Sequence, residues 1–232
     1  NLPKGIFGHV YGQGFEAGKA LVMHPYTKAV GFTGSYGGGK QLFDWANQRK
    51  EPIPVFAEMG SVNPVFLLPE KLRSSATDIA QMYAGSITLG VGQFCTNPGL
   101  IIGIEGTDLN TFTHDLGKAI QKIQPGAMLH AGIVKAYKEN KGKALLQDDV
   151  HLVAESETEV KEDEGLPTVA TASGETFLKN PVLHQEVFGP YSLVIRCKDM
   201  NEMVQVARHL EGQLTATLTA TDHDIIQNEA LV

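Results

Sequence analysis

Short apolar runs alternate with segments of helical periodicity along most of the chain. The apolar runs predict strands at 8–11, 28–33, 55–58, 64–68, 99–104, 151–154, 166–172, 175–179, 191–197 and 213–220. Apolar residues at helical spacing predict helices at 15–23, 40–50, 74–91, 107–123, 131–141 and 199–210, and one more from 222 onward. Strands that alternate with helices in this order predict an α/β fold with a mostly parallel sheet.

A glycine-rich turn, GSYGGG at 34–39, joins the strand predicted at 28–33 to the helix predicted at 40–50. In dinucleotide-binding proteins this arrangement lets backbone N–H groups at the start of a helix face a phosphate. The spacing from Gly34 to Gly39 is not the full G-x-G-x-x-G fingerprint, and a glycine-rich turn without a ligand is an equal alternative. A boundary is expected near Gly60, between the parts 1–60 and 61–232.

Composition narrows the classes of protein. The chain has 232 residues, of which 42% are hydrophobic and 19% charged, as in an ordinary globular protein. A net charge of −7 without blocks of lysine or arginine argues against a nucleic-acid partner. No apolar run approaches the roughly 18 residues that cross a bilayer. Two cysteines are too few for a disulfide framework, which favours a reducing, cytoplasmic compartment. No metal site is expected.

Cys95 lies in a glycine-rich bend, GQFCTNPG at 92–99, between a predicted helix and a predicted strand. Glycines on both sides remove bulk, so that the side chain can face a cleft. A lone cysteine is more often a small buried hydrophobe, and the bend alone leaves both interpretations open. Cys197 follows the apolar run 192–196 and is expected to contribute only packing.

Glu58 ends the strand predicted at 55–58. Ligands of α/β sheets bind outside the carboxyl ends of strands, and a glutamate there is costly to bury unless it is paired or functional. A surface glutamate beside a turn is the alternative on spacing alone.

Four short sequence motifs follow one another in a fixed order along the chain. They are GFTGS at 31–35, FAEMGSVNP at 56–64, GQFCTNPG at 92–99 and QEVFGP at 185–190. Each block is a weak match alone, but together they resemble the aldehyde dehydrogenase superfamily over the whole chain. The resemblance implies part of a Rossmann-type NAD(P)-binding domain at 1–60. It implies an α/β catalytic domain, incomplete at its C-terminus, at 61–232.

The resemblance also implies roles for the residues. Cys95 would be the nucleophile that forms a thiohemiacetal and then a thioester with the aldehyde, and Glu58 would activate the water that hydrolyses the thioester. The pyrophosphate-side loop would include Gly34, Ser35 and Gly39. In the block at 185–190, Glu186 would bind the nicotinamide ribose and Phe188 would pack beside the nicotinamide. The cofactor would be NADP or NAD.

The block after Glu58 departs from the commonest family pattern, Glu-Leu-Gly-Gly-Lys, because it has no lysine. This variant resembles the branch of α-ketoglutarate semialdehyde (2,5-dioxopentanoate) dehydrogenases and bacterial fatty aldehyde dehydrogenases. We therefore expect oxidation of 2,5-dioxopentanoate to 2-oxoglutarate, with a long-chain aldehyde as the alternative substrate. The resemblance further implies a homo-oligomer without nucleic-acid or membrane partners.

Members of the family are longer than this chain, so we expect an internal fragment. The asparagine that completes the family's oxyanion hole would lie before residue 1, and the isolated 232-residue chain is predicted to be inactive. Two alternatives of other classes are a cysteine hydrolase or acyltransferase, which would need a histidine base, and a non-catalytic binding or structural relative. No histidine lies in a recognisable triad setting, and retention of both Cys95 and Glu58 argues against a non-catalytic protein.

Overall fold

The computed structural model describes residues 3–12 and 14–231. It divides into two compact units, Asn1–Gly60 and Ser61–Val232, and each is described by itself. That these units are a cofactor-binding part and a catalytic part stays a prediction.

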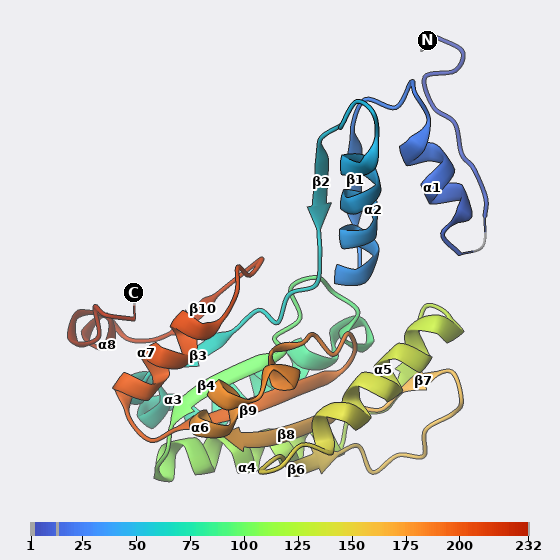
Figure 1. The fold of residues 1–232 in the computed structure, drawn as a ribbon. Helices are drawn as coiled ribbons and strands as arrows, with labels where there is room; N and C mark the ends of the chain where they lie inside the picture. The colour runs from blue at the N-terminus through green and yellow to red at the C-terminus, as the bar shows by residue number, and fades with distance from the viewer. Residues whose placement is uncertain (1–2, 13, 232) are drawn as a thin grey trace. The chain divides into compact units, whose positions relative to one another are not determined.

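The first unit has two helices and two parallel strands (Figure 1). The elements are α1 (Glu16–Met23), β1 (Val30–Thr33), α2 (Tyr36–Gln48) and β2 (Val55–Glu58). The register pairs Thr33 with Glu58, so the two carboxyl ends of the strands lie together. The Arg49 guanidinium fixes the loop after α1, because it donates to the carbonyl oxygens of His24 at 2.7 Å and Thr27 at 3.1 Å.

The second unit is built on a six-stranded sheet in the order β10-β3-β4-β9-β8-β6. All neighbouring strands are parallel except β6, which runs antiparallel to β8, so the prediction of a mostly parallel sheet is confirmed. The strands are β3 (Val65–Leu67), β4 (Leu100–Ile104), β5 (Gly126–Ala127), β6 (His151–Glu155), β7 (Glu164–Gly165), β8 (Thr168–Ser173), β9 (Tyr191–Cys197) and β10 (Thr217–Thr219). The short strands β5 and β7 pair with each other outside this sheet.

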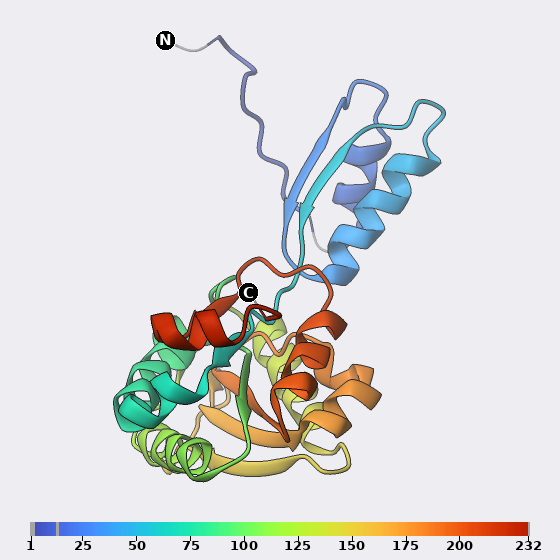
Figure 2. The same ribbon diagram turned by 90° about the vertical axis from the view of Figure 1, so that its left-hand side faces the viewer.

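Helices cover both faces of this sheet (Figure 2). They are α3 (Pro69–Thr88), α4 (Thr107–Gln121), α5 (Ala131–Leu145), α6 (Gly174–Lys179), α7 (Met200–His209) and α8 (Asp222–Gln227), with 3-10 helices η1 (Leu89–Gly92) and η2 (Pro181–His184). Side chains from α3 and α4 pack against one face of the sheet, and side chains from α5, α6 and α7 pack against the other face.

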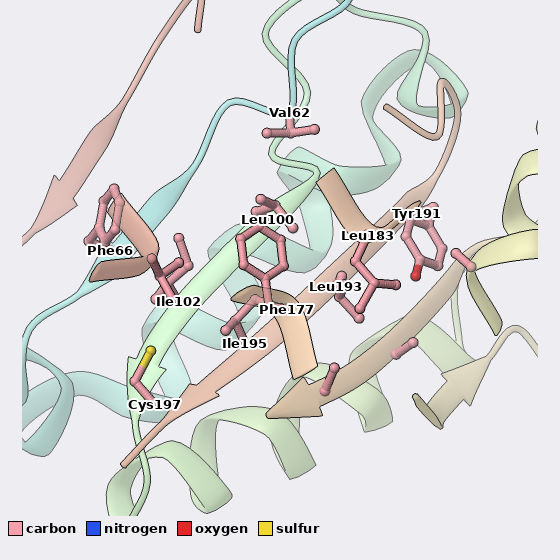
Figure 3. Packing of buried hydrophobic residues seen from close by; sticks show 14 of the residues in the cluster. Val62, Phe66, Leu100, Ile102, Phe177, Leu183, Tyr191, Leu193, Ile195 and Cys197 are labelled. Carbon is pink, nitrogen blue, oxygen red and sulfur yellow. The ribbon is translucent and has the colours of Figure 1, made fainter. Parts of the chain in front are cut away.

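The core follows from the alternation of side chains along each strand. In β4, Leu100 and Ile102 point into one apolar cluster while Ile101 points into the other. Figure 3 shows the first cluster, in which Phe177 packs with Ile102 and Ile195. A parallel strand covered on both faces is apolar at most of its positions, which is why the nearly continuous apolar runs at 99–104 and 191–197 were sufficient to predict β4 and β9, although β9 also carries Ser192 and Arg196.

Several predicted elements are wrong or shifted. Residues 8–11 form no strand, because they are exposed and no described strand pairs with them. The segment 175–179 is not a strand but the helix α6, whose start is capped by the Ser173 hydroxyl accepting from the Thr176 N–H. The strand predicted at 213–220 is only Thr217–Thr219.

Helix boundaries differ for local reasons. The helix α3 begins at Pro69 rather than at 74, because proline suits the first helical turn, and it continues through a kink at Ser75. The N-cap of α4 is Gly106, which has no side chain to accept from the first N–H groups of the helix. Asp199 is the N-cap of α7, its side chain accepting from the Glu202 N–H.

The spacing of the lysines at 135, 138, 141 and 143 predicts one solvated face of α5. For Lys141 this is wrong: its side chain is 14% exposed, and its Nζ lies 2.8 Å from Glu155 Oε1. Glu155 in turn is the last residue of β6.

Candidate active site

Two of the four motif blocks lie at the same edge of the six-stranded sheet. The loop 92–99 leads into β4, and the loop 185–190 leads into β9. These strands are parallel neighbours, with Leu100 opposite Leu193, so both loops lie at the amino ends of their strands. The edge that carries Cys95 is therefore not the carboxyl edge, where ligands of open α/β sheets usually bind.

The two loops are in close contact. A Cβ built on Gly92 would lie 2.2 Å from the carbonyl carbon and oxygen of Gly189, so only glycine fits there. The Asn97 side-chain amide donates to the same Gly189 oxygen at 3.1 Å. These contacts fix the loop that carries Cys95 against the loop that carries Glu186.

The backbone before Cys95 has an unusual conformation. Gly90, Val91 and Gly92 are three consecutive residues with positive φ, at 54°, 60° and 64°. This conformation is costly for a β-branched residue, which persists only where its surroundings hold it. The Val91 side chain packs closely against Gly126 and Gly165. A Cβ added to Gly126 would lie 2.7 Å from one Val91 methyl group, and a Cβ added to Gly165 would lie 3.0 Å from the other.

The two cysteines have opposite environments. Cys95 is exposed, so the interpretation of it as a buried hydrophobe is wrong, and its thiol is accessible to a ligand. Cys197 is completely buried in the first apolar cluster, as expected, and burial raises the pKa of its thiol to about 12. Only Cys95 therefore has the accessibility that a nucleophile needs.

Asn63 is a site residue to which the sequence assigns no role. Its side-chain amide donates to the backbone oxygens of Cys95 and Asn97, at 2.9 Å each. It is 3% exposed and has a positive φ of 45°. The only sequence signal for a role of Asn63 is its position in the motif at 56–64, directly before Pro64.

Glu58 is exposed at the carboxyl end of β2, and its backbone oxygen accepts from the Gly34 N–H at 3.0 Å. This contact places Glu58 beside the glycine-rich turn of the first unit. Cys95 belongs to the other unit, and the pairing of these two side chains stays a prediction.

The glycine-rich turn is shaped as a helix start. Ser35 is the N-cap of α2, and its hydroxyl accepts from the Gly38 N–H at 3.3 Å. Gly34 and Ser35 are exposed, and the first turn of α2 carries no acidic residue, so its N–H groups fit a phosphate. Gly39 is buried instead: a Cβ there would lie 2.6 Å from Met59, so this glycine permits close helix–strand packing.

Glu186 and Phe188 are half-buried in the loop before β9. Burial raises the pKa of the Glu186 carboxyl, and a hydrogen bond from the Ser61 backbone offsets part of this effect. Both side chains line a cavity that Gly92 and Asn97 border as well. With a volume of about 20 Å³ this cavity holds one water molecule, so it is too small to be the substrate pocket.

Residues 3–12 and 14–231 contain no group of three or more metal-binding side chains. In the same part of the chain, none of the helices combines the length and hydrophobicity that crossing a membrane requires.

A family model and curated proteins match nearly the whole length of this chain. The model of the aldehyde dehydrogenase family matches residues 1–230. The chain is 44% identical over 217 residues to "Alpha-ketoglutaric semialdehyde dehydrogenase 2" of Azospirillum brasilense, covering 94% of this chain and 41% of the relative. It is 38% identical over 232 residues to "Alpha-ketoglutaric semialdehyde dehydrogenase" of Acinetobacter baylyi, covering 100% of this chain and 44% of the relative. The chain thus spans less than half the length of these curated relatives.

Solved structures show the same fold. A NAD-dependent benzaldehyde dehydrogenase from Corynebacterium glutamicum matches with a TM-score of 0.78 and 21% identity, over 95% of this chain and 48% of that one. An aldehyde dehydrogenase from Burkholderia cenocepacia, described as putative in its own structure, matches with a TM-score of 0.75 and 21% identity, over 96% of this chain and 48% of that one.

Proposed function

The chain belongs to the aldehyde dehydrogenase family, and on that premise we propose that the whole protein oxidises an aldehyde to a carboxylic acid with NADP or NAD. The observation that carries the proposal is the exposed thiol of Cys95, in a loop held against the loop of Glu186. The substrate proposed is 2,5-dioxopentanoate, with 2-oxoglutarate as the product. It is supported by two relatives, 44% and 38% identical, that are named alpha-ketoglutaric semialdehyde dehydrogenases.

An aldehyde does not lose hydride readily, so a nucleophile must first add to it. The Cys95 thiolate attacks the carbonyl carbon, a C–S bond forms, and the oxygen becomes negatively charged. When this tetrahedral thiohemiacetal collapses, the C=O bond re-forms and hydride leaves, so that the acyl group remains on Cys95 as a thioester. NAD(P)⁺, when bound, accepts that hydride.

Water must then attack the thioester. In the proposal the Glu58 carboxylate takes a proton from this water, the C–S bond breaks, and the acid leaves while the thiolate is restored. The exposure of Glu58 at the carboxyl end of β2 supports this role, since its carboxylate has access to solvent.

Roles in cofactor binding are proposed for residues of two motif blocks. Gly34 and Ser35 would present the N–H groups of α2 to the pyrophosphate, with Gly39 keeping the helix close to its strand. Glu186 would accept a hydrogen bond from the nicotinamide ribose, and Phe188 would pack at the nicotinamide end. Which of NADP and NAD is used follows from residues outside these motifs.

A pre-steady-state assay of the full-length protein tests the proposal. With NAD and NADP in separate experiments, 2,5-dioxopentanoate is compared with a long-chain aldehyde, and the formation of NAD(P)H is followed. We expect kcat/KM to be at least about tenfold higher for 2,5-dioxopentanoate. A higher value for the long-chain aldehyde would favour the fatty aldehyde alternative, and no turnover of any aldehyde would favour a non-catalytic relative.

Oligomeric state and location are proposed as well. We infer a cytoplasmic homo-oligomer in the full-length protein, with small-molecule aldehydes as its partners. Light scattering coupled to size-exclusion chromatography tests the first point and cell fractionation the second. A monomer, or recovery outside the cytoplasm, would contradict them.

A further inference from the structure

Three segments far apart in the sequence meet around the side chain of Asn63. Its Nδ2 donates to the carbonyl oxygens of Cys95 and Asn97, at 2.9 Å each. Its Oδ1 accepts from Thr215 Oγ1 at 3.0 Å and also lies 3.0 Å from the Ser61 hydroxyl. A side-chain amide has two donor hydrogens and two acceptor lone pairs, so both donor positions and at least one acceptor position of Asn63 are occupied.

The backbone of Asn63 supports the view that this amide is specifically required. Its φ of 45° lies in the left-handed region, where glycine is favoured and asparagine is the best tolerated side chain. Asn63 is also 3% exposed, so its polar atoms could not have been left to solvent. A glycine would suit the backbone at least as well, but it would leave the carbonyls of Cys95 and Asn97 and the Thr215 hydroxyl without this partner.

A second set of bonds holds Asn63 in place. The Gln213 side-chain oxygen accepts from the Val62 N–H at 2.7 Å, and the Ser61 hydroxyl shares its one hydrogen between Gln213 Oε1, at 2.9 Å, and Asn63 Oδ1. The Leu214 N–H donates to the same Ser61 hydroxyl at 3.0 Å. The segment 213–215 therefore supports 61–63 from the side opposite the Cys95 loop.

We propose that Asn63 is a positioning residue for the nucleophile, an inference that rests on the proposed function of Cys95. Its two donated bonds fix the carbonyl of Cys95 itself and that of Asn97, which sets the backbone between them. The direction of the Cys95 Cα–Cβ bond, and with it the position of the thiol, follows from that backbone. Attack on a carbonyl needs the reacting atoms close together and aligned, so freeing this loop lowers the rate of attack.

Two variants of the full-length enzyme test the proposal. Asn63→Gly keeps the left-handed backbone without strain and removes the amide. Asn63→Asp keeps the shape but replaces the NH₂ donor by an oxygen that faces two carbonyl oxygens. We expect the rate constant of the NAD(P)H burst to fall about 10- to 100-fold in both, with KM for the aldehyde changed less than about threefold.

Readouts other than turnover separate positioning from folding. The rate of Cys95 alkylation by iodoacetamide, measured from pH 6 to 10, should change in magnitude and in its pH profile in both variants. The burst amplitude per folded protein should stay near that of the wild type. A purely structural role would instead lower the amplitude and the melting temperature while each active site kept the wild-type rate constant.

Matched variants keep the test decisive. Asn110→Asp makes the same charge change on an exposed position of α4 and should leave the burst unchanged. Thr215→Val removes one bond to Asn63 Oδ1 from an exposed position, so it should fold even where the Asn63 variants do not, and it should slow the burst about two- to fivefold. A wild-type burst in Thr215→Val and in a folded Asn63→Gly would overturn the proposal.

The result for Cys95→Ser separates this inference from the function on which it rests. If that variant keeps full turnover, Cys95 is not the nucleophile and the proposed function fails. If it is inactive while Asn63→Gly behaves as the wild type, only the positioning role of Asn63 fails.

Discussion

The two cysteines mark two regions of the same sheet that are held by different forces. Cys197 is the last residue of β9 and pairs with Ile104 at the carboxyl end of β4, inside packed hydrocarbon. Cys95 lies before the amino end of β4, exposed, in a loop shaped by left-handed residues and side-chain amides. The first environment follows from apolar burial alone, whereas the second needs particular polar atoms at particular positions.

The two regions differ in the protonation of the thiol and in backbone strain, and this difference explains why the region of Cys95 suits nucleophilic chemistry. The thiol of Cys197 is neutral at ordinary pH, because burial raises its pKa to about 12. At the amino edge, left-handed residues such as Val91 and Asn63 each cost roughly 1 kcal/mol or more, and the surrounding contacts must offset this. Such strain is often found where a side chain is held in a functional position.

The largest expected contrast is between variants of the two cysteines. In the full-length enzyme, Cys95→Ser should lower kcat/KM at least about 10³-fold, because serine is a far weaker nucleophile at neutral pH. Cys197→Ser should keep kcat/KM within about threefold, while it lowers the melting temperature because it buries an unpaired hydroxyl. Steady-state kinetics and thermal melting of both variants measure these effects. A kcat/KM of Cys95→Ser equal to that of the wild type would contradict the prediction.

Glu58→Gln should give the next largest effect. The amide keeps the size of the side chain but cannot take a proton from water, so steady turnover should slow about 10²-fold or more. The first NAD(P)H burst should keep its rate, since thiol addition precedes the step that Glu58 serves. Stopped-flow measurement resolves the two phases, and loss of the burst with normal deacylation would assign Glu58 a different role.

The stability of the core should depend on the volume of its buried side chains. Ile102 is fully buried between sheet and helices, so Ile102→Ala should cost about 2–5 kcal/mol of unfolding free energy. Leu146, which is 84% exposed, provides the control, and Leu146→Ala should change the unfolding free energy by less than about 0.5 kcal/mol. Urea unfolding followed by fluorescence measures both; similar shifts in the two variants would contradict the assignment of the core.

The sequence predicts these two regions unequally well for a physical reason. Continuous apolar runs are local, so β4 and β9 could be located from the pattern alone. The helix α6 was missed because Thr176 and Phe177 favour a strand locally, while the cap from Ser173 decides for a helix. Tertiary pairing is equally invisible at 8–11, where an apolar pattern finds no partner strand.

The candidate site divides in the same way. Cys95 and Glu58 stand out through the motif blocks that carry the family resemblance. The bonds of Asn63 join residues 32, 34 and 152 positions apart, which no local pattern encodes. The polar contacts that shape the amino edge therefore became visible only in three dimensions.

The smallest predicted effect is on the pH dependence of stability. The pKa of Cys197 is raised from 9.0 to about 12 in the folded chain, so between these values the folded state binds a proton that the unfolded state has released. Stability should therefore fall as pH rises above about 9, by at most about 1.4 kcal/mol per pH unit from this group. Urea midpoints between pH 8 and 10.5 should decline less steeply in Cys197→Val, and parallel declines would contradict the prediction.

The most direct test of the account is to find where the acyl group is attached. The full-length Glu58→Gln variant is mixed with NADP or NAD and 2,5-dioxopentanoate, quenched in acid during the burst, and digested for mass spectrometry. We predict that the acyl group is on the peptide that contains Cys95, and that the peptide containing Cys197 is unmodified. A burst of NAD(P)H with no acyl group on Cys95 would contradict the central claim.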